Sequence, residues 1–315
     1  MAFSSEVDAR VLARDPLVTL ARVELGATLY LDEPVHWARE GAARALEVFL
    51  SRTPAELRCW YTTSHLDNWV RARPALEAEW VENLRISGLA AQPRHLFEFA
   101  LADDAGTPSQ GFRYREVDPR RAERAPYIEL TLPQEASGAD LETLVREVAA
   151  CGPVLCGVGG ATVRWNPLYR FTAFARIRGW CKRFLGVDVQ EPEESCWTAR
   201  EKLPGSNWLT VCGPGFAVRP ELAALAAWTG PADAVQVSEL GGGSLLVRAG
   251  KEPTLGDRNA LDFPAALARV AAALAPLFGP PPEGVGIWQR RIPGPKEWMH
   301  RLVEPEAWIR HVPDV

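Results

Sequence analysis

The segment from Leu203 to Asn259 constrains the fold of this chain more than any other part of its sequence. An apolar run from Trp208 to Cys212 predicts a strand, and the glycines and proline that follow it predict a break. A helix-like run rich in Ala and Leu comes next, and then two strand-like runs joined through residues 241–243, which are all glycine. No nucleophile–base pair or metal-ligand cluster lies among these elements. The segment is therefore more typical of a structured protein surface than of a reaction centre.

Three strand-like runs in the first half are separated by short polar loops, which predicts an antiparallel meander. They extend from Leu96 to Ala102, from Gly111 to Val117 and from Tyr127 to Leu132. A helix from Asp140 to Ala150 and an apolar strand from Val154 to Val163 follow. Antiparallel sheets covered by helices define an α+β fold. The order of elements in the second half echoes the first, which is compatible with two similar α/β halves from an old duplication.

Two further helices are predicted by the spacing of apolar residues. Leu66 to Leu84 is expected to be helical with a break near Pro74, and Trp165 to Leu185 is expected to form a helix with a basic region. That basic region contains Arg170, Arg176, Arg178, Lys182 and Arg183.

The chain of 315 residues is long enough to bury a large core. We divide it into an N-terminal α/β region (1–92), a main α+β region (93–279) and an irregular C-terminal wrap (280–315) that ends in a short helix. The wrap is rich in Pro and Gly, and Trp288 and Trp298 are expected to anchor it.

Composition is that of an ordinary globular protein, with 47% hydrophobic and 24% charged residues. Glu6 and Asp8 lie where a secretory signal would begin its apolar core, so we expect a cytoplasmic protein that does not enter a membrane. A net charge of −5 argues against direct binding of nucleic acid through its phosphates and suits a basic partner.

Motifs for catalysis, metals and cofactors are weak. Cys151 and Cys156 could form half of a zinc site, but no second pair accompanies them, so we expect packed thiols, no metal and no cofactor. The glycines of GVGGAT lack the context of a phosphate-binding loop. Cys212, between a strand and a helix, is the nearest approach to a nucleophile, and a core cysteine is the commoner case at such a position.

The loop from Asp188 to Glu194 (DVQEPEE) is the most concentrated negative patch of the sequence. It either keeps the surface soluble or docks a basic partner. Trp197 and Trp288 could anchor such a partner, because tryptophan is frequent where interfaces are strongest. The expected contact residues are Asp188, Glu191, Glu193, Glu194, Trp197 and Trp288.

The motifs GVDV (186–189), LPGSNWLT with GPGF, and LGGGSLLVRAGKEPTLGDRN together resemble the TsiV-like family of type VI secretion immunity proteins. The resemblance implies a non-enzymatic protein that binds and neutralises a cognate toxin, with no catalytic residues. Such toxins are often nucleases, so the implied partner is a basic, nuclease-like protein. The alternatives are an adaptor or structural subunit of a secretion or defence system, or a hydrolase that uses Cys212 or a loop carboxylate.

Overall fold

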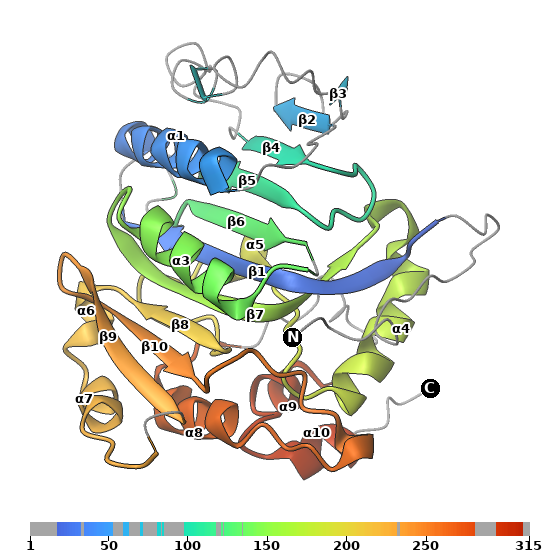
Figure 1. Ribbon diagram of the computed structural model, residues 1–315, viewed down its shortest axis with the longest axis vertical. Helices are drawn as coiled ribbons and strands as arrows, with labels where there is room; N and C mark the ends of the chain where they lie inside the picture. The colour runs from blue at the N-terminus through green and yellow to red at the C-terminus, as the bar shows by residue number, and fades with distance from the viewer. Residues whose placement is uncertain are drawn as a thin grey trace.

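In the computed structural model the described residues form one antiparallel sheet of ten strands in the order β3-β2-β4-β5-β6-β1-β7-β8-β10-β9 (Figure 1). The structure describes residues 18–32, 35–52, 59–62, 70–71, 81–82, 84, 98–117, 121, 123–133, 135–231, 234–280 and 294–310. The strands are β1 (Ala21–Leu31), β2 (Cys59–Thr62), β3 (Val70–Arg71), β4 (Glu98–Ala102), β5 (Gly111–Arg115), β6 (Tyr127–Leu132), β7 (Val154–Trp165), β8 (Leu209–Cys212), β9 (Val235–Gly241) and β10 (Ser244–Ala249). The sheet and its helices confirm the α+β fold.

The first strand of the chain lies in the middle of this sheet. β1 pairs with β6 on one side and with β7 on the other, so that Leu25 lies opposite both Leu132 and Ala161. Nearly every residue of β1 is buried, and its sequence has the β-branched and apolar residues that suit a central position. The predicted meander is confirmed, because β4, β5 and β6 pair in chain order.

One face of the sheet is covered by two helices that pack against each other, α1 (Val35–Arg52) and α3 (Gly138–Ala149) (Figure 1). α3 begins at a capping box, in which Ser137 and Asp140 bond each other's backbone N–H groups. Its four apolar residues at helical spacing, Leu141, Leu144, Val145 and Val148, are all buried, as predicted.

On the opposite face, α8 (Ala265–Leu274) packs against β10. α9 (Pro295–Met299) and α10 (Pro305–Arg310) follow at the end of the chain and pack against each other, and Trp308 of α10 donates a hydrogen bond to the carbonyl of Cys181 in α4 (Arg170–Arg183). A cavity of about 40 Å³ lies between Tyr30 and Val158 of the sheet, Ala271 of α8 and Trp298 of α9. It has room for a few water molecules and not for a substrate.

The remaining helices are α5 (Pro192–Ser195), α6 (Pro214–Ala217) and α7 (Pro220–Ala226). No helix in the described part of the chain is long and apolar enough to cross a membrane.

Two predictions of secondary structure need correction. The expected helix over 66–84 is wrong at Val70–Arg71, which form β3 and pair antiparallel with β2, because pairing with a distant strand overrides the local helical pattern. Residues 81–82 and 84 are helical as expected, and the rest of that range lies outside the described residues. In the C-terminal wrap, Pro295–Met299 form the helix α9 where an irregular chain was expected, since Pro295 starts a helix well.

Candidate functional site

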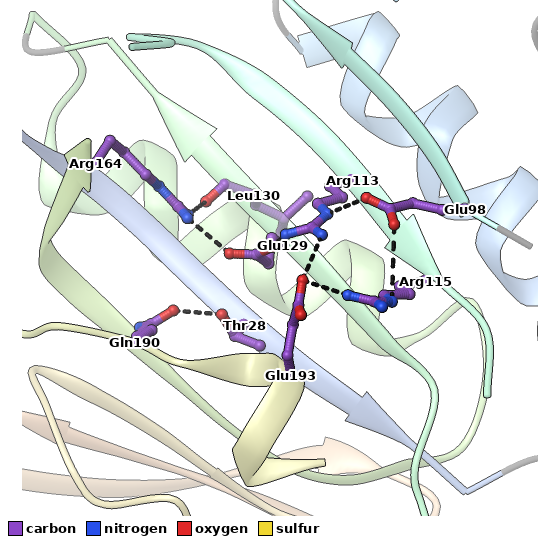
Figure 2. Close-up of polar contacts among 9 residues, drawn as sticks. All are labelled: Thr28, Glu98, Arg113, Arg115, Glu129, Leu130, Arg164, Gln190 and Glu193. Atoms are coloured by element: carbon purple, nitrogen blue, oxygen red, sulfur yellow. Dashed lines mark hydrogen bonds and ion pairs between the residues drawn. The ribbon is translucent and has the colours of Figure 1, made fainter. Parts of the chain in front are cut away.

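Charged side chains replace apolar ones on one face of β4, β5, β6 and β7. Directly opposite residues of neighbouring strands share a face, and the register sets Arg113 opposite Glu129 and Glu98 opposite Arg115. Arg164 of β7 reaches the same cluster across β1 (Figure 2). We call these five residues, Glu98, Arg113, Arg115, Glu129 and Arg164, the sheet-face network.

Glu129 is the centre of the network. One of its oxygens, Oε2, lies 3.0 Å from Nη1 of Arg113, and the other, Oε1, lies 2.7 Å from Nη1 of Arg164. Burial by itself would raise the pKa of this carboxyl, but the two guanidinium groups outweigh that effect and hold the pKa below its ordinary value. Glu129 therefore stays ionised and is a structural group.

The short helix α5 rests on this network through Glu193. Oε1 of Glu193 lies 3.0 Å from Nη2 of Arg113, and the same oxygen pairs with Nη1 of Arg115 (Figure 2). Gln190, which lies just before α5, accepts a hydrogen bond from the hydroxyl of Thr28. The acidic loop is thus fixed to the polar face of the sheet, and part of its negative charge is neutralised there.

The structure brings four of the predicted contact residues together. Glu193 and Glu194 belong to α5, Glu191 comes just before it, and Trp197 lies two residues beyond its end. The side chain of Glu193 is 51% exposed, and those of Glu191 and Glu194 are partly exposed. We call Glu191, Glu193, Glu194 and Trp197 the α5 surface.

Two arginine side chains lie over the ring of Trp197. The guanidinium carbon of Arg124 lies 3.2 Å from the centre of its ring, and that of Arg121 lies 5.5 Å away. The indole is partly buried and packs against the core. Its ring is therefore already stacked within the protein, with only one part open to a partner.

Asp188 lines the cavity together with Glu191 but is not part of the exposed α5 surface. Its Oδ1 accepts a hydrogen bond of 3.3 Å from Nη2 of Arg301, and its side chain is only 14% exposed. Burial raises the pKa of Asp188 despite this arginine, which opposes the shift. This carboxylate holds the C-terminal region to the sheet. Trp288 lies outside the described residues.

The cysteines that were weak candidates for catalysis or metal binding lie in environments typical of core residues. Burial raises the pKa of the Cys212 thiol to about 12, so the thiol is protonated at neutral pH. Cys156 lies directly opposite it on β7 and is equally buried, and its pKa is raised by burial as well. Within the described residues no group of three or more His, Cys, Asp or Glu side chains could hold a metal ion.

The sheet-face network was missed by the sequence reasoning. Its signal was present, because GFRYR and YIELTL place Arg113, Arg115 and Glu129 at every second position between apolar residues. That alternation indicates one charged face and one apolar face of a strand. Which arginine meets which glutamate depends on the register, and the sequence does not give it.

Two comparisons with known proteins found a match. A family model, TsiV, described as type VI immunity for VRR-NUC, matches residues 44–284. Among solved structures, a type VI secretion system (T6SS) protein of Pseudomonas aeruginosa, PA0821, superimposes with a TM-score of 0.68 at 18% sequence identity. The likeness covers 92% of this chain and 85% of that one, and it shows a shared fold. No curated protein matches the sequence.

Proposed function

This chain belongs to the TsiV family of type VI immunity proteins, and we propose that it protects its cell by binding a VRR-NUC nuclease toxin in a stoichiometric complex. The observation that carries the proposal is the family match over residues 44–284, which includes the sheet from β4 to β10 and the whole α5 surface. The toxin would be blocked by occupation of its working surface, and this chain would convert nothing.

The arrangement of charge supports a binding function. Glu129 and Glu193 each pair with two arginines, which fixes both carboxylates in place. The lowered pKa of Glu129 also makes that carboxylate a poor proton carrier. Rigid side chains lose little entropy when a partner docks on them, which favours tight binding. The hydrolase alternative loses its best nucleophile, since Cys212 is buried and protonated.

We propose that the α5 surface meets a basic part of the toxin. A nuclease needs cationic side chains to hold the phosphates of its substrate, and Glu191, Glu193 and Glu194 offer carboxylates to them. Charges of this kind chiefly speed the encounter of two proteins. The encounter would take place in the cytoplasm, where a toxin of this class reaches nucleic acid.

Protection of a cell requires tight binding. An affinity in the nanomolar range corresponds to about −12 kcal/mol. An interface of roughly 1,600 Å² with a few well-packed anchors supplies that much.

The test is a titration of a purified VRR-NUC toxin from the same organism in a DNA-cleavage assay. We expect cleavage to stop when one equivalent of this chain has been added, and the two proteins to co-elute from a sizing column. Inactivation by a small fraction of an equivalent would indicate an enzyme. If the toxin stays fully active and does not co-elute, the chain has a non-toxic partner and the adaptor alternative is favoured.

A further inference from the structure

Helix α4 presents an exposed stripe that the α5 surface does not include. Thr172, Arg176, Gly179 and Arg183 recur at intervals of four, three and four residues and therefore lie on one side of the helix. The first three are exposed, and the side chain of Arg183 is 38% exposed. The other side of α4 is buried in the core through Ala173, Phe174, Ile177 and Cys181. In Figure 1, α4 lies at the edge of the molecule beside the end of β7.

Large apolar side chains lie exposed at the beginning of this stripe. Leu168, in the turn before α4, is 87% exposed, and Phe171, in its first turn, is 64% exposed. The guanidinium of Arg170 lies 4.8 Å from the centre of the Phe171 ring and leaves the ring open to solvent. Two such side chains within four residues form an apolar patch that the fold does not cover.

A second apolar patch lies at the other end of α4. The loop over residues 257–263 is fixed to the end of the helix, because Arg183 pairs with Asp257 at 2.8 Å and Arg258 donates a hydrogen bond to the carbonyl of Lys182 at 3.1 Å. This loop carries Leu261, which is 92% exposed, and Phe263, which is 47% exposed. The helix therefore connects two apolar patches. We call Leu168, Phe171, Arg176, Gly179, Leu261 and Phe263 the α4 surface.

Leu261 is held in an unfavourable backbone conformation. Its φ is +57°, and among the described residues it is the only non-glycine residue with a positive φ. A leucine in this region of conformational space is strained, and its exposed side chain gains nothing from packing within the chain. Strain combined with exposure is typical of a residue that works in binding.

Gly179 is the second unusual feature of the stripe. A glycine inside a helix costs roughly 1 kcal/mol relative to alanine, and a Cβ at this position would meet nothing within 4 Å. The fold of the chain therefore has no need of a glycine here. A partner that lies close against the backbone of α4 would need one.

The charge of α4 specifies the partner's chemistry. The helix has five basic residues and no acidic one, in a protein whose net charge is −5. On the stripe itself Arg183 is already paired with Asp257, and the exposed Arg176 lies between the two apolar patches. This arrangement fits a protein surface that has a carboxylate between apolar pockets. A nucleic acid fits less well, because its backbone offers no pocket for leucine and phenylalanine and the net charge of the chain repels it.

We propose that the α4 surface anchors the toxin by docking against an acidic surface of that protein, an inference that rests on the proposed function. A phosphodiester-cleaving enzyme that uses metal ions has cations for the phosphate backbone beside carboxylates for the metal. The α5 surface and the α4 surface would then meet opposite charges of one partner. The apolar patches of the α4 surface set how slowly the complex dissociates.

The decisive variant is Gly179→Arg. Arginine is a good helix former, so the substitution preserves α4. Its long side chain blocks close approach of a partner to the helix backbone, while its positive charge improves the match to an acidic partner surface. With the same VRR-NUC toxin, inactivated in its nuclease site, we expect the Kd to rise by at least about 30-fold in a surface-binding assay. Gly215→Arg on α6 is the matched control, because a Cβ there also meets nothing within 4 Å, and we expect a change of less than about twofold.

The second apolar patch is tested by the pair Leu261→Ser and Phe263→Ser. We expect the pair to raise the Kd by about 10- to 100-fold, mostly through faster dissociation. Val218→Ser is the control, because Val218 is a similarly exposed apolar residue (83%) away from α4. Circular dichroism and thermal unfolding confirm that each variant is folded.

Three outcomes are distinct. If the wild-type chain does not bind the toxin, the proposed function fails. If the wild type binds but Gly179→Arg and the serine pair bind equally well, the proposed function stands and the α4 surface is not the anchor. If the wild type binds a short DNA duplex and the serine pair or Asp substituted for Arg176 abolishes that binding, the stripe is a nucleic-acid site and the inference is overturned.

Discussion

The guanidinium of Arg164 passes over Gly26, a residue of the neighbouring strand β1. A Cβ at residue 26 would lie 3.2 Å from Nη2 of Arg164 and 2.5 Å from Cγ2 of Thr162. The missing side chain gives Arg164 its path across β1 to Glu129 on β6.

Gly26→Ala is therefore expected to destabilise the protein by about 1–3 kcal/mol, because the methyl group displaces Thr162 and Arg164. The measurement is urea denaturation at pH 7. Gly179→Ala is the matched control and should stabilise the helix by roughly 0.5–1 kcal/mol, because it adds helix propensity in open space. Equal effects of the two substitutions would show that the network does not need the glycine.

Glu129→Gln removes the charge that Arg113 and Arg164 share. We expect a loss of about 3–5 kcal/mol at pH 7, since the largely buried Arg164 loses its carboxylate partner and Arg113 loses one of three. The pKa of Glu129 is lowered in the fold, so its contribution to stability is present above the ordinary carboxyl pKa and is lost as the pH falls through the lowered value. The difference between variant and wild type should therefore shrink below about pH 4. Glu306→Gln, at a pair whose side chains are 68% and 78% exposed, should change stability by less than about 1 kcal/mol.

Arg301 joins the C-terminal region to the sheet side of the molecule. Its Nε and Nη2 donate hydrogen bonds of 3.1 Å to the carbonyls of Leu185 and Val187, and its guanidinium stacks on Trp298 at 3.6 Å. Lysine keeps a positive charge but cannot reach both carbonyls and stack on the ring. We expect Arg301→Lys to cost at least about 2 kcal/mol in the free energy of unfolding, whereas Arg310→Lys on the exposed α10 should be close to neutral. A small effect of both would mean that the guanidinium geometry is unimportant.

The α5 surface is tested by reversing charge at Glu191, Glu193 and Glu194. We expect slower association with the toxin and a weaker dependence of the association rate on salt, because fewer charges attract the partner. Stopped-flow kinetics over a salt series gives both quantities. Lysine at position 193 would lie beside Arg113 and Arg115, so stability has to be measured in parallel. Kinetics identical to wild type at every salt concentration would exclude the α5 surface from the encounter.

Cys212→Ala separates binding from catalysis by this residue. The thiol is buried in the core, so its removal should cost about 1 kcal/mol of stability and leave neutralisation of the toxin intact. In the folded protein a thiol reagent at pH 8 should modify Cys212 only as fast as the fold opens. Loss of protection by a well-folded Cys212→Ala variant would support the hydrolase alternative.

Local features of the fold could be predicted from the sequence, and long-range ones could not. The spacing of Leu141, Leu144, Val145 and Val148 gives α3 its buried face, because helical periodicity is a property of neighbouring residues. Val70 pairs with β2 because of tertiary contact, which outweighed the helical pattern around it.

The candidate site shows the same division. The acidic loop was recognisable as a cluster of charge, but the arginines that neutralise Glu193 and Asp188 come from β5 and from beyond α9. The exposure of Leu261 was equally hidden, because a leucine in a sequence gives no sign that the fold leaves it uncovered. Register and exposure are set by the packing of the whole chain.

The central place of β1 has a consequence for synthesis. A ribosome makes this strand early, yet β6 and β7, its two neighbours in the sheet, are translated much later. Until residue 132 has left the exit tunnel, both edges of this apolar strand are unpaired, and one edge stays unpaired until β7 has emerged as far as residue 165. An unpaired edge is a target for chaperones and proteases. An incompletely translated chain therefore cannot form the sheet and cannot protect the cell. A cell exposed to the toxin relies on molecules of this protein that had folded before the exposure.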